Sequence, residues 1–100
     1  MKVLFICNQN MHRSKTAQEL FKDKFETKSA GLYNNLVTKY QLDWADVVMV
    51  MDDGQRSEIA KRFPKQYMKK RILSLGISDI YKYNQPELVC ILQNKVNELL

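Results

Sequence analysis

The sequence predicts an α/β fold: a three-layer sandwich with a four-stranded parallel sheet and helices on both faces. Short apolar runs alternate along the chain with longer segments whose apolar residues recur every three or four positions. Such alternation is typical of strand–helix–strand units, which place successive strands in parallel. The first run, Val3–Ile6, is apolar at every position, as expected of a strand that helices cover on both sides. We expect a single domain over residues 1–100.

Three strands and two helices are expected in the first half of the chain. Ser14 and Thr16 are cap-like residues at the start of the first helix, and Gly31 ends the second strand. The third strand is the most β-like run, and two aspartates and a glycine follow it. The expected strands cover 2–6, 25–30 and 47–51, the helices cover about 13–24 and 36–44, and a turn occupies 32–35.

Two helices and the fourth strand are expected in the second half. Asp53 caps the first of these helices and Pro64 stops it. Asn84 or Gln85 caps the final helix, which has Pro86 in its first turn and one apolar stripe along its length. Between these helices we expect a linker at 66–70, a strand at 71–75 and a loop at 77–83.

Composition indicates a soluble globular protein, with 45% hydrophobic and 27% charged residues. No apolar run approaches the roughly 18 residues of a membrane span, and no leader segment opens the chain. We therefore expect a cytoplasmic protein without a membrane partner. The net charge of +5 favours anionic, phosphorylated substrates. A nucleic-acid partner would rest on this charge alone and is not expected.

The few cysteines and histidines limit the possible chemistry. Cys7 and Cys90 form no disulfide framework, and Cys90 is expected to be inert packing within the final helix. His12 is the only histidine, so a multi-histidine metal site is not available. We expect neither a metal nor another cofactor.

The stretch from Val3 to Ser14 carries the chemistry. Cys7 ends a strand, Arg13 follows after five intervening residues, and Ser14 comes next at the start of a helix. A loop between a strand and a helix turns its N–H groups towards one point, where the helix N-terminus adds positive potential. Such a cradle binds a tetrahedral oxyanion and favours the thiolate of a cysteine at its base, while Arg13 offers a planar fork to two oxygens. This arrangement suits nucleophilic attack on a phosphate.

Two more residues of this stretch fit the same chemistry. Ser14 is placed to donate a hydrogen bond to the sulfur and to ease its departure in a second step. Asn10 tolerates the positive φ that a tight loop without glycine requires. The simpler alternative is that Cys7 is a small buried hydrophobe at the end of a strand.

The sequence resembles the low-molecular-weight protein tyrosine phosphatases. Their phosphate-binding loop reads Cys-x-x-Asn-x-Cys-Arg-Ser, which Cys7, Asn10, Arg13 and Ser14 match. The chain is shorter than a typical member, as expected of a compact variant. Three further segments resemble the family's second short motif, its central strand and its Asp-Pro-Tyr acid loop, in the same order: Ser29–Gly31, Ala45–Asp52 and Ser78–Tyr81.

The resemblance implies a cysteine-dependent phosphatase that hydrolyses phosphotyrosine, in a protein or a small aryl phosphate, and releases inorganic phosphate. Cys7 attacks the phosphorus to form a phosphocysteine, Arg13 binds the oxygens, and Asp79 serves as acid and then as base. Asn10 and Ser14 support the loop, and Ser29 is implied to hold Asn10 through a hydrogen bond. The implied phosphate- and substrate-binding residues are Asn8, Gln9, Asn10, Met11, His12, Arg13, Ser14 and, as a wall of the pocket, Tyr81.

Three positions depart from the family or bear on its substrates. Ile80 replaces the proline after the acid, which leaves the acid loop less rigid. His12 replaces the second loop cysteine, so no disulfide can protect Cys7 there; His12 either adds positive charge near the thiolate or points into solvent. Met11 resembles the larger aliphatic residue of tyrosine-specific relatives and not the threonine of those that act on phosphoarginine.

Two other functions remain open at this stage. Arsenate reductases share the fold and the nucleophile, but they need resolving cysteines, and only Cys90 is available here. The chain is alternatively a phosphate- or phosphopeptide-binding module without an efficient acid. Asp52 is interpreted as structural in every case.

Overall fold

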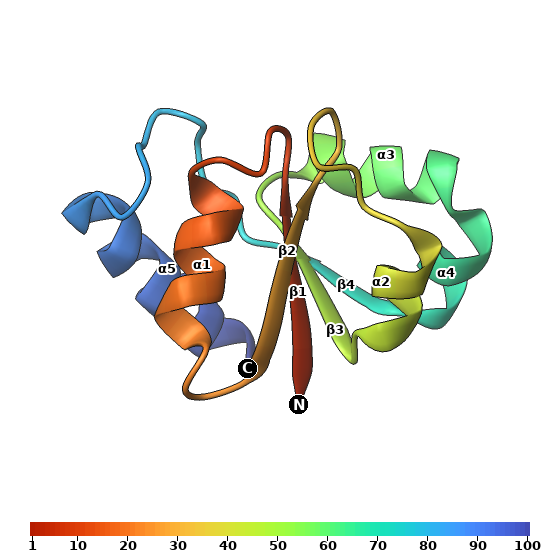
Figure 1. Cartoon of the computed structure of the whole chain (residues 1–100), viewed down its shortest axis with the longest axis horizontal. Coiled ribbons are helices and arrows are strands. Elements are labelled where there is room, and N and C mark those ends of the chain that lie inside the picture. Colours follow the sequence, from red (N-terminus) through yellow and green to blue (C-terminus); the bar gives the residue numbers. More distant parts are fainter.

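The computed structural model describes residues 1–100 and shows the expected parallel sheet (Figure 1). Neighbouring strands are parallel throughout and lie in the order β2-β1-β3-β4. The prediction of a four-stranded parallel sheet is therefore confirmed. Its strands are β1 (Lys2–Cys7), β2 (Glu26–Gly31), β3 (Val47–Val50) and β4 (Arg71–Ser74).

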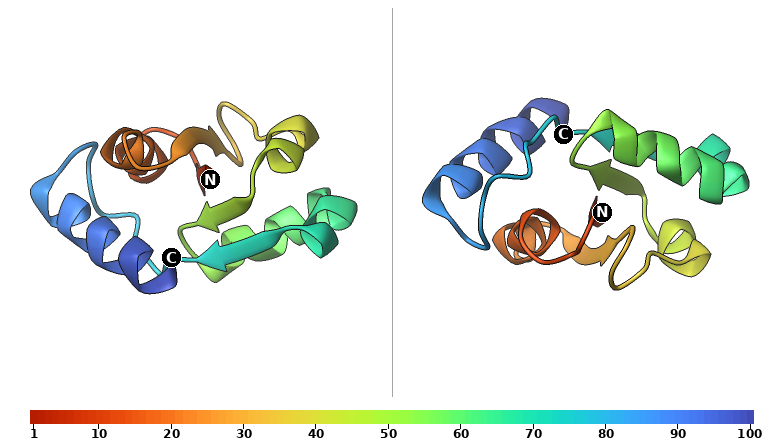
Figure 2. Two further views of the ribbon diagram at one scale, coloured as in Figure 1. Left: turned by 90° about the horizontal axis from the view of Figure 1, so that it is seen from below. Right: turned by 90° about the horizontal axis from the view of Figure 1, so that it is seen from above.

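Helices cover both faces of the sheet, as the two views of Figure 2 show. α1 (Arg13–Phe21) and α5 (Pro86–Leu99) pack on one face. The other face is covered by three helices: α2 (Lys39–Trp44), α3 (Asp53–Arg62) and α4 (Pro64–Lys69). The predicted three-layer arrangement is therefore also confirmed.

Side chains of the central strand β1 alternate between two cores, as the two-residue period of a strand requires. Val3 and Phe5 pack with Leu92 of α5 in one core. Leu4 and Ile6 pack with Ile59 of α3 in the other. All six of these side chains are fully buried, which explains why the stretch Val3–Ile6 of β1 is apolar throughout.

Two predictions about the helices after β3 are wrong. The N-cap of α3 is Asp52 and not Asp53, because the Asp52 Oδ1 atom accepts a hydrogen bond from the Gln55 N–H at 2.9 Å. α3 ends at Arg62, just before Pro64, as predicted, but Pro64 then starts α4, so the predicted linker at 66–70 is mostly helical. Proline has no N–H to leave unpaired in a first turn, and its fixed φ suits that position.

Other element boundaries shift by a few residues. α1 ends at Phe21, earlier than predicted, and β2 extends to Gly31, which pairs with Cys7. α2 starts only at Lys39, because the preceding Thr38 forms a capping box with Gln41. In the final helix, Gln85 occupies the N-cap position, without a side-chain cap.

The carboxyl ends of the parallel strands meet at one edge of the sheet, at the top of Figure 1. The loops that leave β1, β2, β3 and β4 therefore gather there, and this edge is where open α/β sheets bind ligands. No helix in the structure is both long and apolar enough to span a membrane.

The packing of α5 gives a test of the fold. Leu92 is fully buried, whereas Cys90 of the same helix is exposed. We expect Leu92→Ala to lower the free energy of unfolding by about 2–5 kcal/mol, because it leaves a cavity in the core. Cys90→Ala is the matched control and should change it by less than about 0.5 kcal/mol. Urea denaturation of both variants measures the difference; equal effects would contradict the orientation of α5.

Candidate active site

Cys7 lies at the carboxyl end of β1 and begins the candidate site. Its side chain is buried at 3% exposure, and the loop after it leads directly into α1. None of the backbone N–H groups of residues 8–15 donates a hydrogen bond within the protein. A row of free N–H donors beside a helix N-terminus is a binding site for an oxyanion.

A hydrogen bond joins the cysteine to the first turn of α1. The Cys7 Sγ and Ser14 Oγ atoms are 3.0 Å apart. The Asn10 side-chain N–H donates to the same Ser14 oxygen at 2.8 Å, which directs the Ser14 proton towards the sulfur. Asn10 has a φ of 51°, as expected for this loop. The structure therefore brings Cys7, Asn10 and Ser14 together as the sequence predicts.

The residue that holds Asn10 is Asn35 and not Ser29. The Asn35 side-chain N–H donates to the Asn10 Oδ1 atom at 2.6 Å. Ser29 instead donates to the Gln18 Oε1 atom at 2.5 Å, because Ser29 lies two residues before the end of β2, beside α1. The prediction of a Ser29–Asn10 hydrogen bond is therefore wrong. The sequence predicts only a turn at Asn35, since nothing in its local sequence indicates its partner.

Gly31 allows the loop after β2 to approach the loop after Cys7. A Cβ atom at this position would lie 2.0 Å from the Asn34 carbonyl oxygen and 3.2 Å from the Asn10 Cβ atom. The site therefore requires glycine here because of crowding, and Gly31 places the 32–35 turn where Asn35 reaches Asn10.

Gln55 is a second residue that sequence reasoning missed. Its side chain is 2% exposed, and its Nε2 atom donates to the Asn8 Oδ1 atom at 3.2 Å. Its Oε1 atom accepts from the Met51 N–H at 2.7 Å. Gln55 thus joins the start of the Cys7 loop to the end of β3. The Asn8 side-chain oxygen is engaged in this contact, and the Asn8 backbone N–H is one of the donors left for a ligand.

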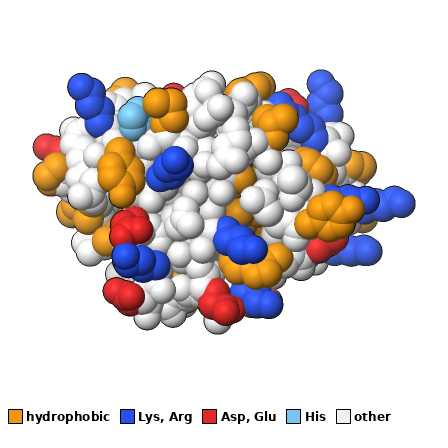
Figure 3. All heavy atoms as spheres, viewed as in Figure 1, with side chains coloured by type: hydrophobic (Ala, Val, Ile, Leu, Met, Phe, Trp, Pro, Cys, Tyr) orange, Lys and Arg blue, Asp and Glu red, His pale blue; other side chains and the backbone are white.

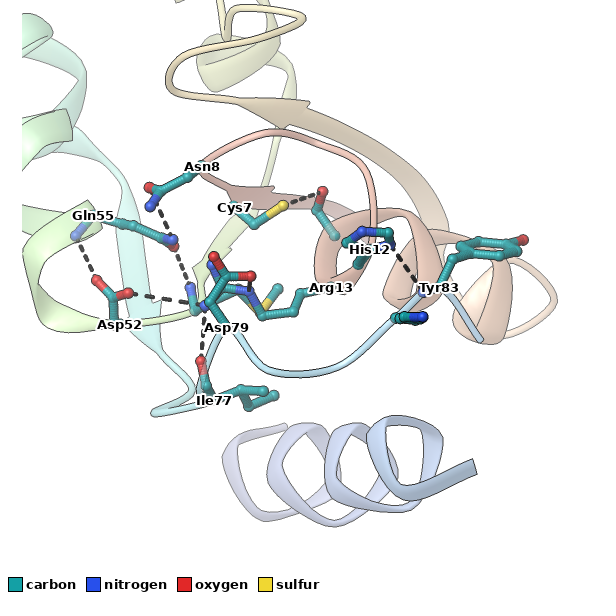
Figure 4. Close-up of polar contacts among 12 residues, drawn as sticks. Cys7, Asn8, His12, Arg13, Asp52, Gln55, Ile77, Asp79 and Tyr83 are labelled. Carbon is teal, nitrogen blue, oxygen red and sulfur yellow. Dashed lines mark hydrogen bonds and ion pairs between the residues drawn. The ribbon is translucent and has the colours of Figure 1, made fainter. Parts of the chain in front are cut away.

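The Arg13 guanidinium lies among groups from two other loops (Figure 4). Arg13 is 2% exposed, and its Nη1 atom donates to the Ile77 carbonyl oxygen at 2.8 Å. The same atom lies 3.9 Å from Asp52 Oδ2, and Nε lies 3.5 Å from Asp79 Oδ1. Asp52 is therefore a helix cap that also pairs with Arg13, which agrees with its structural interpretation.

A small cavity of about 120 Å³ unites most of the predicted site residues. Asp79 projects into it from the loop after β4, with a side chain that is 64% exposed. Tyr81, predicted as a wall, does not line this cavity; it is half-buried and packs against the core beneath α5. The lining residues are Cys7, Gln9, Met11, His12, Arg13 and Asp79.

Two side chains hold the Asp79 loop: His12, the N-cap of α1, and Thr16 in its first turn. We call this pair the loop clamp. The His12 Nδ1 atom accepts a hydrogen bond from the Tyr83 N–H at 3.0 Å. The Thr16 Oγ1 atom accepts from the Asn84 N–H at 2.8 Å. His12 thus neither points into solvent nor directs Nδ1 as a donor to Cys7; Nδ1 acts as an acceptor and supports the Asp79 loop.

No group of three or more acidic, histidine or cysteine side chains is arranged to hold a metal ion. The two cysteines are both free. Cys90 is exposed on the outer face of α5, which corrects the expectation that it is packing.

No family model and no curated protein matches the sequence, whereas many solved structures have the same fold. AmsI, a tyrosine phosphatase of Erwinia amylovora, matches with a TM-score of 0.80 at 18% identity, over 97% of this chain and 89% of AmsI. A low-molecular-weight protein tyrosine phosphatase from T. tengcongensis matches at 0.76 and 20% identity, over 100% and 99% of the two chains. A cysteine-to-serine variant of the YwlE arginine phosphatase, with a phosphorylated active-site serine, matches at 0.76 and 22% identity, over 99% and 95%. The chain therefore has the fold of these phosphatases.

The crowding at Gly31 predicts that Gly31→Ala damages both the fold and the anion site. A methyl group there must displace backbone, and we expect a loss of at least about 1–3 kcal/mol in the free energy of unfolding. Weaker binding of phosphate or vanadate should accompany this loss, because Asn35 moves away from Asn10. Urea denaturation and isothermal titration calorimetry measure the two effects.

Gly54→Ala is the matched control for this experiment. Gly54 lies in the first turn of α3, where an added Cβ meets only the Asp52 side chain, at 3.2 Å. Alanine is favoured over glycine in a helix by about 1 kcal/mol. This gain offsets the cost of the close contact with Asp52, so we expect little net change in the free energy of unfolding. If Gly31→Ala binds phosphate as the unmodified chain does, the contact between the two loops has no role in the site.

Proposed function

We propose that this chain is a cysteine-dependent phosphatase that hydrolyses phosphotyrosine and related aryl phosphates through a phosphocysteine. The observation that carries the proposal is the shared cavity. It places a buried thiol, a buried guanidinium and a carboxyl group around unpaired backbone N–H donors. These groups are a nucleophile, an oxyanion site and a proton donor. The shared fold with solved phosphatases supports the same conclusion.

In the first step, the Cys7 thiolate attacks phosphorus and the bond to the phenolic oxygen breaks. The N–H groups of residues 8–15 bind the equatorial oxygens, and the N-terminus of α1 stabilises their charge. Nη1 of Arg13 is committed to Ile77, so Nε and Nη2 form the fork that faces the phosphate. The anion then takes the place of Asp79 beside the Arg13 Nε atom.

The departing phenolate needs a proton, and Asp79 is the group placed to supply it. Asp79 borders the same cavity as Cys7 and is open to water. In the second step, the Asp79 carboxylate accepts a proton from the attacking water, and inorganic phosphate leaves. The Ser14 hydroxyl, 3.0 Å from the sulfur, stabilises the thiolate as it departs. The phosphorylated active-site serine in the YwlE variant supports a phosphoenzyme of this kind.

Phosphotyrosine is the substrate that we favour. Met11 borders the cavity with 53% of its surface exposed, and it offers an apolar contact to an aromatic ring at the entrance. AmsI is a tyrosine phosphatase and YwlE an arginine phosphatase, so the fold alone does not select the substrate. Comparison of kcat/KM for phosphotyrosine and phosphoarginine peptides tests this substrate preference.

The location of Cys90 argues against arsenate reduction. Resolution of an arsenate adduct requires a second thiol that reaches Cys7. Cys90 lies on the solvent face of α5, whereas Cys7 is buried in the core at the end of β1. A disulfide between them would require α5 to leave its place in that core.

Leaving-group dependence tests the roles of Cys7 and Asp79. We expect Cys7→Ser to abolish turnover of para-nitrophenyl phosphate, with or without a chelator. Asp79→Asn should lower kcat for phenyl phosphate by about 10²–10⁴-fold. Its effect on para-nitrophenyl phosphate should be much smaller, because para-nitrophenolate leaves without a proton. Steady-state kinetics on both substrates measures the ratio.

Asp23→Asn, an exposed carboxyl in the turn after α1, is the control and should change neither rate. An equal effect of Asp79→Asn on the two substrates would show that Asp79 is not the acid. If the folded, unmodified chain binds vanadate but turns over neither substrate, it is a phosphate-binding module.

A further inference from the structure

We infer that a groove along α1, next to the cavity, binds an acidic residue of the substrate close to its phosphorylated residue. The inference rests on the proposed function and specifies its substrate class. The α1 groove has a volume of about 480 Å³ and is lined by Met11, Lys15, Gln18, Glu19 and Tyr83. Met11 also lines the cavity that contains Cys7, so the two hollows adjoin.

The relative size of the two hollows explains why a second contact region is needed. The cavity at Cys7 is about 120 Å³, a quarter of the volume of the α1 groove. It accommodates the phosphate-bearing end of one side chain. The residues next to that side chain in a protein substrate must therefore lie on the surface around the cavity, and the α1 groove is the hollow that continues from it.

The groove is preformed by bonds that do not involve a substrate. Its two sides are α1 and the loop before α5, and the loop clamp joins them at Tyr83 and Asn84. Gln18 is also fixed, because its Oε1 atom accepts from the Ser29 hydroxyl at 2.5 Å. A preformed groove loses little conformational entropy when a peptide binds.

Lys15 is the one charged group of the groove that is free to bind a partner. Glu19 forms an ion pair with Lys22 at 2.5 Å, and this hydrogen bond and charge raise the pKa of Lys22 above its usual value. Lys15 is exposed and forms no hydrogen bond or salt bridge. The net electrostatic preference of the groove is therefore for a carboxylate.

Apolar surface flanks this charge. Met11 and Tyr83 are 53% and 49% exposed, and they are suited to pack against the aliphatic part of a glutamate side chain. Figure 3 shows hydrophobic, basic and acidic side chains close together over α1. The groove thus combines one free cation with two apolar walls beside the reacting group.

The test uses a set of phosphotyrosine peptides in which a single Glu is moved from two residues before to two residues after the phosphotyrosine. Peptides with Gln at the same place are the neutral reference. For the unmodified chain, we expect Glu to raise kcat/KM over Gln by about two- to fivefold at one position. Added salt should reduce this preference. Lys15→Glu should invert it, so that Gln exceeds Glu.

Lys61→Glu is the matched control, because it changes the net charge equally at an exposed position of α3, on the opposite face of the sheet. It should keep the preference of the unmodified chain. A Glu-to-Gln ratio near one at every position, or the same ratio in Lys15→Glu as in the unmodified chain, would overturn the inference.

Failure of the proposed function is recognised separately. If no aryl phosphate or peptide is hydrolysed, the phosphatase assignment fails. The same peptides are then compared by their dissociation constants for Cys7→Ser with Lys15 intact or replaced by Glu, using fluorescence anisotropy. Equal constants for the Glu and Gln peptides in that measurement would overturn the groove assignment too.

Discussion

The buried guanidinium of Arg13 is the interaction on which the site depends. Its backbone starts α1 after β1, while its side chain meets Asp52 after β3 and the segment from Ile77 to Asp79 after β4. One cation therefore joins the ends of three parallel strands. A buried charge costs several kcal/mol unless acceptors compensate it. These contacts supply the compensation and fix the fork at the base of the cavity.

Neutral amide side chains hold the rest of the Cys7 loop, and their lack of charge has an electrostatic consequence. Asn8, Asn10, Asn35 and Gln55 connect the loop to the ends of β2 and β3. An amide both donates and accepts hydrogen bonds without adding a charge. Carboxylates in these places would repel the thiolate and an anionic substrate. The two carboxylates that do lie close to the site, Asp52 and Asp79, are both paired with Arg13.

Much of the fold follows from local patterns, whereas the supporting network does not. The apolar runs indicate β1 and β3 because these strands are buried almost throughout, and the Cys7–Ser14 spacing indicates the loop. β2 and β4 are partly exposed and mixed in composition, so their signal is the alternation of strands with helices. Asn35 and Gln55 gave no signal, because their partners are distant in sequence. The prediction for Ser29 is wrong for the same reason: its neighbour in space is Gln18 of α1. The N-cap of α3 is Asp52 and not Asp53 because the helix starts one residue earlier than predicted. Two adjacent aspartates are equally suitable caps, so the sequence does not distinguish them.

The loop clamp has a consequence for how this architecture can diversify. His12 and Thr16 accept hydrogen bonds from main-chain N–H groups, not from side chains, of the loop that carries Asp79. Position 83 is therefore held whatever its side chain is, and only proline, which lacks the N–H, is excluded there. Substitutions at position 83 can therefore reshape this side of the α1 groove without moving Cys7. The surface at position 83 can thus vary in shape and charge while the arrangement of Cys7, Arg13 and Asp79 stays the same.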